Sequence, residues 1–163
     1  MIDPHLVKAM ARDSIIFACA NPVPEIWPWE AQEAGARIVA TGRSDFPNQV
    51  NNSLVFPGIF RGVLDVRART ISDGMAMAVA GALAACAEDQ GLREDRILSD
   101  MGDRHVAAQI AATVGMAAQQ EGVAGLSAGK AELYRRAYAT IEAAQNAAGI
   151  LLREGVIAAP PPA

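Results

Sequence analysis

The sequence predicts an α/β fold in which a partial Rossmann-like parallel sheet is followed by C-terminal helices. Two short runs, residues 14–20 and 37–42, have the length and the continuous apolar character of buried strands in a parallel sheet, and we expect the first to be buried on both faces. A loop and a short helical segment lie between them, so strand, helix and strand follow one another within about 30 residues, as in a βαβ unit. Beyond residue 58 the apolar residues recur at helical spacing, which predicts helices and almost no further strand.

The boundaries of the first elements follow from residues with special backbone chemistry. Asp3 can cap a helix whose first turn holds Pro4. The first strand ends before Pro22, because proline cannot donate to a continuing ladder. The helix between the strands is predicted over 29–34, with Gly35 as its C-terminal cap.

Four helical stretches are predicted after the βαβ unit. They begin at Ile59, Ser72, His105 and Ala131, and the last runs to Glu154. We expect one domain over residues 1–157 and a disordered tail over residues 158–163, where three prolines follow one another.

Composition excludes several classes of function. The 163 residues carry a net charge of −4 and no basic run, which argues against nucleic acid as a partner. Cys19 and Cys86 lie far apart and lack the spacing of metal ligands. No stretch of about 18 apolar residues is free of charge and no N-terminal signal is present, so we expect a cytoplasmic protein with no membrane partner.

Asn21 is the first candidate site residue. It stands at the end of a predicted parallel strand, where ligands of open α/β sheets bind. Its amide can both donate and accept hydrogen bonds. An Asn-Pro pair also commonly forms a turn, and this alternative stays open.

The loop after the second predicted strand is the other candidate. Its chemistry suits a carboxylate or a hydroxy acid, although an asparagine-rich surface turn is the alternative. The amides are those of Asn48, Gln49, Asn51 and Asn52, close to Arg43 and Asp45.

The remaining polar candidates favour structural interpretations. His5 and His105 have no partner nearby in the sequence, so we expect surface positions rather than catalysis. Arg61 is expected to form a local ion pair, and Tyr134 and Tyr138, one turn apart, are expected to pack or to form an interface.

Three segments together look like the C-terminal part of a bacterial malic enzyme. They are NPVPEI at residues 21–26, IVATGRSDFPNQVNN at residues 38–52 and FPGIFRGVLDVRA at residues 56–68. The resemblance is ungapped from Ile15 to about Ala68 and continues loosely to Ile157.

The resemblance implies a function and a set of site residues. Malic enzymes oxidise L-malate with NAD or NADP and decarboxylate it to pyruvate and CO₂, with Mg²⁺ or Mn²⁺, and this chain is similar to the later part of their NAD(P)-binding domain. In the family, the asparagine of the Asn-Pro motif and one of the Asn-Asn pair face malate and the nicotinamide. Those positions are Asn21, and Asn52 or Asn51, here.

The same resemblance implies what the chain lacks. The family's Gly-rich dinucleotide loop, catalytic lysine and tyrosine and acidic metal ligands precede the similar region, and no G-x-G occurs in the 163 residues. No catalytic residue and no metal ligand is therefore expected on this chain. We expect a fragment of a malic oxidoreductase that is inactive by itself.

A function of another class remains open. Strands apolar on both faces, without their upstream neighbours, would leave a sheet edge uncovered. Such an edge could make the chain a non-catalytic interaction or regulatory module, or a decayed gene product. In either interpretation we expect a homo-oligomer.

Overall fold

The computed structural model describes residues 1–159, so most of the tail expected over residues 158–163 lies outside the described residues. The chain divides into two compact units. Unit 1 comprises Met1–Phe56 and Gly81–Met101, and unit 2 comprises Pro57–Ala80 and the described part of Gly102–Ala163.

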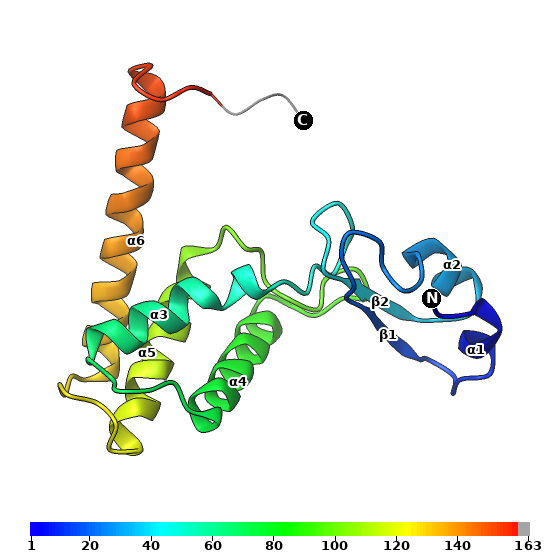
Figure 1. The fold of residues 1–163 in the computed structure, drawn as a ribbon, viewed down its shortest axis with the longest axis horizontal. Coiled ribbons are helices and arrows are strands. Elements are labelled where there is room, and N and C mark those ends of the chain that lie inside the picture. Colours follow the sequence, from blue (N-terminus) through cyan, green and yellow to red (C-terminus); the bar gives the residue numbers. More distant parts are fainter. Residues whose placement is uncertain (160–163) are drawn as a thin grey trace. The chain divides into compact units, whose positions relative to one another are not determined.

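Unit 1 contains the predicted βαβ unit (Figure 1). Strands β1 (Ile15–Ala18) and β2 (Ile38–Thr41) pair in parallel, with Ala18 opposite Thr41. Helix α2 (Pro28–Glu33) connects them and α1 (Pro4–Lys8) precedes them. The predicted α/β class, a two-stranded parallel sheet followed by helices, is confirmed.

The predicted helix ends in unit 1 are also confirmed. The Asp3 carboxylate accepts a hydrogen bond from the His5 backbone N–H at 2.8 Å, which caps α1. Gly35 follows α2 with a φ of 105°, a conformation that favours glycine because it has no Cβ.

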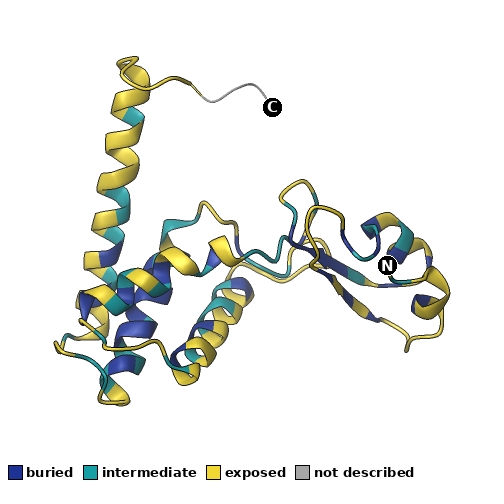
Figure 2. Ribbon diagram, viewed as in Figure 1, coloured by how far each residue is buried: buried dark blue, intermediate teal, exposed yellow. Residues whose placement is uncertain are grey.

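The core of unit 1 lies between the sheet and the two short helices (Figure 2). Its buried residues are Val7, Ile16, Ala18, Ile26, Ala31, Ala34, Ala36 and Val39. Burial of these apolar side chains fixes which face of each strand the helices cover.

The expectation that the first strand is buried on both faces is wrong. Burial alternates along β1, and Ile15 and Phe17 remain 50% and 57% exposed. They line an open groove of about 470 Å³ beside Ile38, the second half of α4 and the segment after it. In the described chain, therefore, only the face of β1 towards α1 and α2 is fully covered, whereas β2 is buried from Val39 to Thr41.

Unit 2 is helical and its helices fall where the spacing predicts them. They are α3 (Phe56–Asp65), whose first residue belongs to unit 1, α5 (Arg104–Gln120) and α6 (Lys130–Arg153). Helix α4 (Asp73–Asp89) contributes its first half to unit 2 and its second half to unit 1. A 3₁₀ turn, η1 (Asn52–Leu54), precedes α3 and belongs to unit 1.

Helix α3 packs on α5 through glycines. A Cβ at Gly58 would lie 2.8 Å from the Ala107 carbonyl oxygen, and a Cβ at Gly62 would overlap the carbonyl oxygen of Ala111. The absence of side chains therefore allows close approach of the two backbones. The large apolar residues Phe60 and Leu64 lie on the exposed side of the same helix.

Among the described residues, no helix combines the length and the apolar character that crossing a membrane requires.

Candidate functional site

The candidate site lies at the carboxyl ends of β1 and β2. Because the strands are parallel and in register, the loops that follow them leave the sheet at the same edge. The Asn21 side chain is exposed there and lies against Gly42, where a Cβ would be 3.1 Å from the Asn21 Nδ2 atom. It would also be 3.3 Å from the Cys19 carbonyl oxygen, so glycine leaves the room that the Asn21 amide occupies.

Asn51 holds the second loop to the same glycine. Its Nδ2 atom donates to the Gly42 carbonyl oxygen at 3.1 Å. Its Oδ1 atom accepts from the backbone N–H and the hydroxyl of Ser53, at 3.0 and 2.8 Å, and so caps η1. Both ends of the Asn51 amide are therefore engaged within the protein.

Asn52 differs from its neighbour. Its side chain is exposed, and within residues 1–159 the structure gives it no hydrogen bond. Asn21 and Asn51 thus meet at Gly42, and Asn52 follows with an amide open to solvent.

Asn48 is not available to a ligand. Its buried Nδ2 atom donates to the carbonyl oxygens of Val39 and Glu94, at 3.1 and 2.7 Å. Its Oδ1 atom accepts from the Ile97 backbone N–H at 2.9 Å. The predicted hydrogen-bonding loop therefore uses this amide to fasten β2 to the segment after α4.

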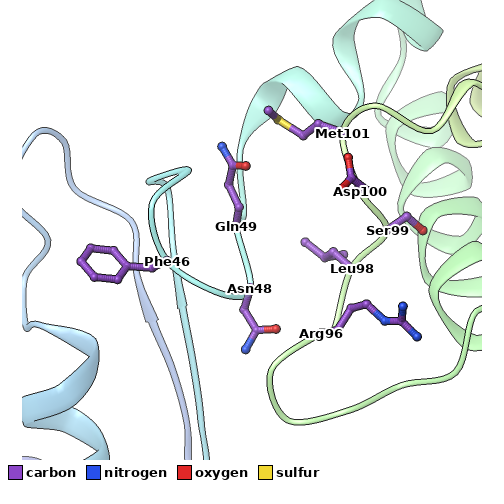
Figure 3. A pocket seen from close by; sticks show the side chains of 8 residues that line it. All are labelled: Phe46, Asn48, Gln49, Arg96, Leu98, Ser99, Asp100 and Met101. Carbon is purple, nitrogen blue, oxygen red and sulfur yellow. The ribbon is translucent and has the colours of Figure 1, made fainter. Parts of the chain in front are cut away.

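A cavity of about 250 Å³ opens beside this fastening (Figure 3). Two facing segments of unit 1 line it, with the residues Phe46, Asn48, Gln49, Arg96, Leu98, Ser99, Asp100 and Met101. The Asn48 amide is engaged as described, and Arg96 donates to the carbonyl oxygens of Gln90 and Gly91. Its polar side chains do not converge on one point, and we assign it no ligand.

Glu25 organises the loop that carries Asn21. Its Oε2 atom accepts a hydrogen bond from the Ala20 backbone N–H at 3.0 Å. Two backbone hydrogen bonds to the carboxylate lower the pKa of Glu25 below its ordinary value of 4.5. The bond from Ala20 has the larger effect, and the bond from the backbone N–H of Glu25 itself has the smaller. Because folding lowers its pKa, the Glu25 carboxylate stabilises the fold at a pH above its pKa in the unfolded chain. This stabilisation is lost as the pH falls through its pKa in the folded chain.

We therefore expect the Ala20 amide signal in ¹⁵N–¹H NMR spectra to titrate with a midpoint below 4.5. The Glu25→Gln variant should abolish this titration, because a neutral amide keeps an acceptor oxygen but has no proton to gain. Glu33→Gln, an exposed change on α2, is the matched control and should leave it intact. A midpoint above 4.5 would contradict the role of Glu25.

Two predictions about unit 2 are confirmed. Arg61 forms a local ion pair with Asp65, one turn along α3. His105 is exposed at the surface, as expected. Its partners come from α6, distant in sequence: its Nδ1 atom lies 2.6 Å from the Tyr134 hydroxyl, and its ring centroid 4.9 Å from that of Tyr138.

No group of three or more His, Cys, Asp or Glu side chains within residues 1–159 is arranged to hold a metal ion. The side chains of the described residues therefore do not fit a divalent cation.

A parallel βαβ unit with polar side chains at its carboxyl edge is typical of α/β domains that bind ligands beyond the ends of their strands, nucleotide-binding domains among them. Residues 2–119 match the family described as "Malic enzyme, NAD binding domain". The chain belongs to the malic enzyme family and forms part of an NAD(P)-binding domain.

Relatives and solved structures agree with this membership. The chain is 51% identical over 123 residues to a bifunctional malic/malolactic enzyme of Bacillus subtilis, covering 76% of this chain and 30% of that protein. It is 57% identical over 89 residues to an NADP-dependent malic enzyme of Rhizobium meliloti, covering 54% of this chain and 12% of that protein.

The crystal structure of Entamoeba histolytica malic enzyme superposes with a TM-score of 0.95 at 46% identity, covering 98% of this chain and 33% of that one. The chain thus spans about a third or less of the length of these proteins.

Proposed function

We propose that this chain supplies the edge of a malic enzyme's NAD(P)-binding domain that orients L-malate and the nicotinamide during oxidative decarboxylation to pyruvate and CO₂. The observation that carries the proposal is the Asn21 amide, seated on Gly42 at the carboxyl edge of the sheet. Asn51 fixes that glycine, and Asn52 presents a second amide without an internal partner in the described chain.

The chemistry of an amide suits this role. Its oxygen can accept from the malate hydroxyl, and its NH₂ group can donate to a carboxylate or to the nicotinamide carboxamide. NAD or NADP, when bound, supplies the acceptor of the hydride. Asn21 and Asn52 would fix the angle at which the two molecules meet, which is a contribution of position rather than of proton transfer.

The same residues indicate how tightly the chain by itself can bind malate. Neutral hydrogen bonds contribute about 1 kcal/mol each, so two amides give affinities in the millimolar range or weaker. The sequence has no G-x-G to cradle a pyrophosphate. We therefore propose that the chain by itself binds malate weakly and does not turn it over.

The test has two parts on the 163-residue chain. Absorbance at a wavelength that reports NADH or NADPH should show no malate-dependent reduction with either cofactor, with Mg²⁺ or Mn²⁺ added. NMR spectra with excess L-malate and NAD⁺ should show shifts of the Asn21 and Asn52 side-chain signals that are absent with succinate, which lacks the hydroxyl. Asn146, exposed on α6, is the matched asparagine that should not respond. Equal shifts at Asn146, or no shift at all, would refute the orienting role.

A second candidate function, an interaction module, rests on β1. Within the described residues β1 pairs with β2 alone, and Ile15 and Phe17 are exposed beside the apolar groove. An uncovered strand edge favours pairing with another strand, so we propose that copies of the chain associate through β1.

Light scattering should then show a homo-oligomer that Phe17→Lys converts to a monomer. Met77→Lys, an equally drastic change at an exposed position of α4, should leave it associated. A monomeric wild-type chain would exclude this candidate.

A further inference from the structure

Arg43 joins the loops that leave the two strands. Its Nη1 atom donates to the Pro22 carbonyl oxygen at 2.6 Å. Its Nε and Nη2 atoms donate to the two carboxylate oxygens of Asp45, at 2.9 and 2.7 Å. The hydrogen bond from Arg43 lowers the pKa of Asp45 below its ordinary value of 3.8, so the carboxylate stays charged at neutral pH.

Aromatic rings hold the guanidinium in place. Its central carbon lies 5.6 Å from the ring centroid of Trp27 and 5.5 Å from that of Phe46. Trp27 in turn stacks on Trp29, with centroids 4.9 Å apart and planes 9° from parallel. The Arg43 side chain is 30% exposed. Only a planar fork can bind a carboxylate in bidentate fashion, reach a carbonyl and stack at once, so lysine is not an equivalent residue.

Arg43 is linked to Asn21 from two sides, through Pro22 and through Gly42. The carbonyl that Arg43 binds belongs to Pro22, which follows Asn21, and the glycine that the Asn21 amide contacts precedes Arg43. We propose that Arg43 is a positioning residue that fixes the Asn21 amide at the carboxyl edge of the sheet through the Pro22 carbonyl. Its consequence for malate rests on the proposed function, whereas its effect on Asn21 requires no ligand.

The chain contains a matched arginine that lacks this role. Arg93 binds Asp95 with the same spacing and nearly the same geometry, at 2.8 and 2.7 Å. Its side chain is 62% exposed, and the structure gives its guanidinium no carbonyl of a distant loop within residues 1–159. A bidentate ion pair two residues apart is therefore not sufficient to position a neighbouring loop.

The side-chain NH₂ signals of Asn21, together with the Val23 amide signal, provide the test without ligand. Arg43→Ala should shift these signals, while Arg93→Ala leaves them unchanged. Arg43→Lys keeps one donor for the Pro22 carbonyl and should give an intermediate shift. Amide signals of Ile16 and Val39 report whether the sheet remains folded. If Arg43→Ala unfolds unit 1, the lysine variant decides. Unchanged Asn21 signals in a folded Arg43 variant would overturn the proposal.

Adding L-malate and NAD⁺ separates this proposal from the proposed function. If the wild-type chain responds, Arg43→Ala should bind about tenfold more weakly, as expected when a charge-assisted hydrogen bond no longer holds the loop. Equal affinity in that case would overturn the proposal. If the wild-type chain does not respond, the proposed function fails, and the Asn21 shifts still decide whether Arg43 positions the amide.

Discussion

Replacing Asn48 with alanine should lower the free energy of unfolding of unit 1 by about 3 kcal/mol. The variant removes three hydrogen bonds and leaves the carbonyls of Val39 and Glu94 and the N–H of Ile97 without their partner. Residue 48 also has a φ of 55°, which asparagine adopts more readily than alanine. A polar residue outside the apolar core is therefore expected to stabilise unit 1 about as much as a buried aliphatic side chain.

Tryptophan fluorescence during urea unfolding measures this loss. Trp27 and Trp29 are the two tryptophans of the chain and both lie in unit 1, so the signal reports that unit. Asn52→Ala is the matched control, because its exposed side chain has no hydrogen bond among residues 1–159, and it should change stability by less than about 0.5 kcal/mol. Equal midpoints for the two variants would contradict the role of Asn48.

Replacing Gly62 with alanine should destabilise unit 2 by about 2 kcal/mol or more. The new Cβ would overlap the Ala111 carbonyl oxygen and lie 2.8 Å from the Val114 Cβ atom. A backbone oxygen within α5 cannot move without breaking helical hydrogen bonds, so α3 would have to shift away.

Gly81→Ala is the opposite case. This glycine lies within α4, and a Cβ there would meet no atom within 4 Å. Alanine should stabilise that helix by about 0.5–1 kcal/mol.

The two tyrosines of the chain, Tyr134 and Tyr138, lie in unit 2 with Gly62, so their ring signals in NMR spectra report the unfolding of Gly62→Ala. Gly81 belongs to unit 1, so tryptophan fluorescence reports the unfolding of Gly81→Ala. A loss of stability in Gly81→Ala as large as that in Gly62→Ala would show that close packing is not the cause.

Local pattern predicted the elements well because the information for them is local. The spacing of apolar residues, together with proline, glycine and aspartate at element ends, located both strands and the long helices of the described chain to within a few residues. It was harder to predict which face of each strand or helix is buried. Ile15 and Phe17 resemble the side chains of a doubly covered strand, yet coverage depends on elements distant in sequence. In α3 the buried side consists of Gly58, Gly62 and Asp65, which hydrophobic periodicity cannot identify.

The candidate site was less accessible to sequence reasoning. Asn21 and Asn52 could be identified through the resemblance, and their roles stay a prediction. The structural use of Asn48 depends on Glu94 and Ile97, more than 40 residues away. Arg43 and Asp45 were visible as neighbours in a polar loop, but nothing local indicated that the arginine binds the Pro22 carbonyl.

Helix α6 has one further consequence, which concerns the helix–coil equilibrium. Its first half is anchored because Leu133 and Ala137 are buried, the latter against α5. From Ala143 to Arg153 every residue except the half-buried Gly149 is exposed. A stretch of about ten exposed residues is too short for its propagated hydrogen bonds to offset the cost of nucleating a helix in water, so this half persists by propagation from the anchored turns. Each hydrogen bond there depends on the one before it, and amide exchange should become progressively faster towards Arg153.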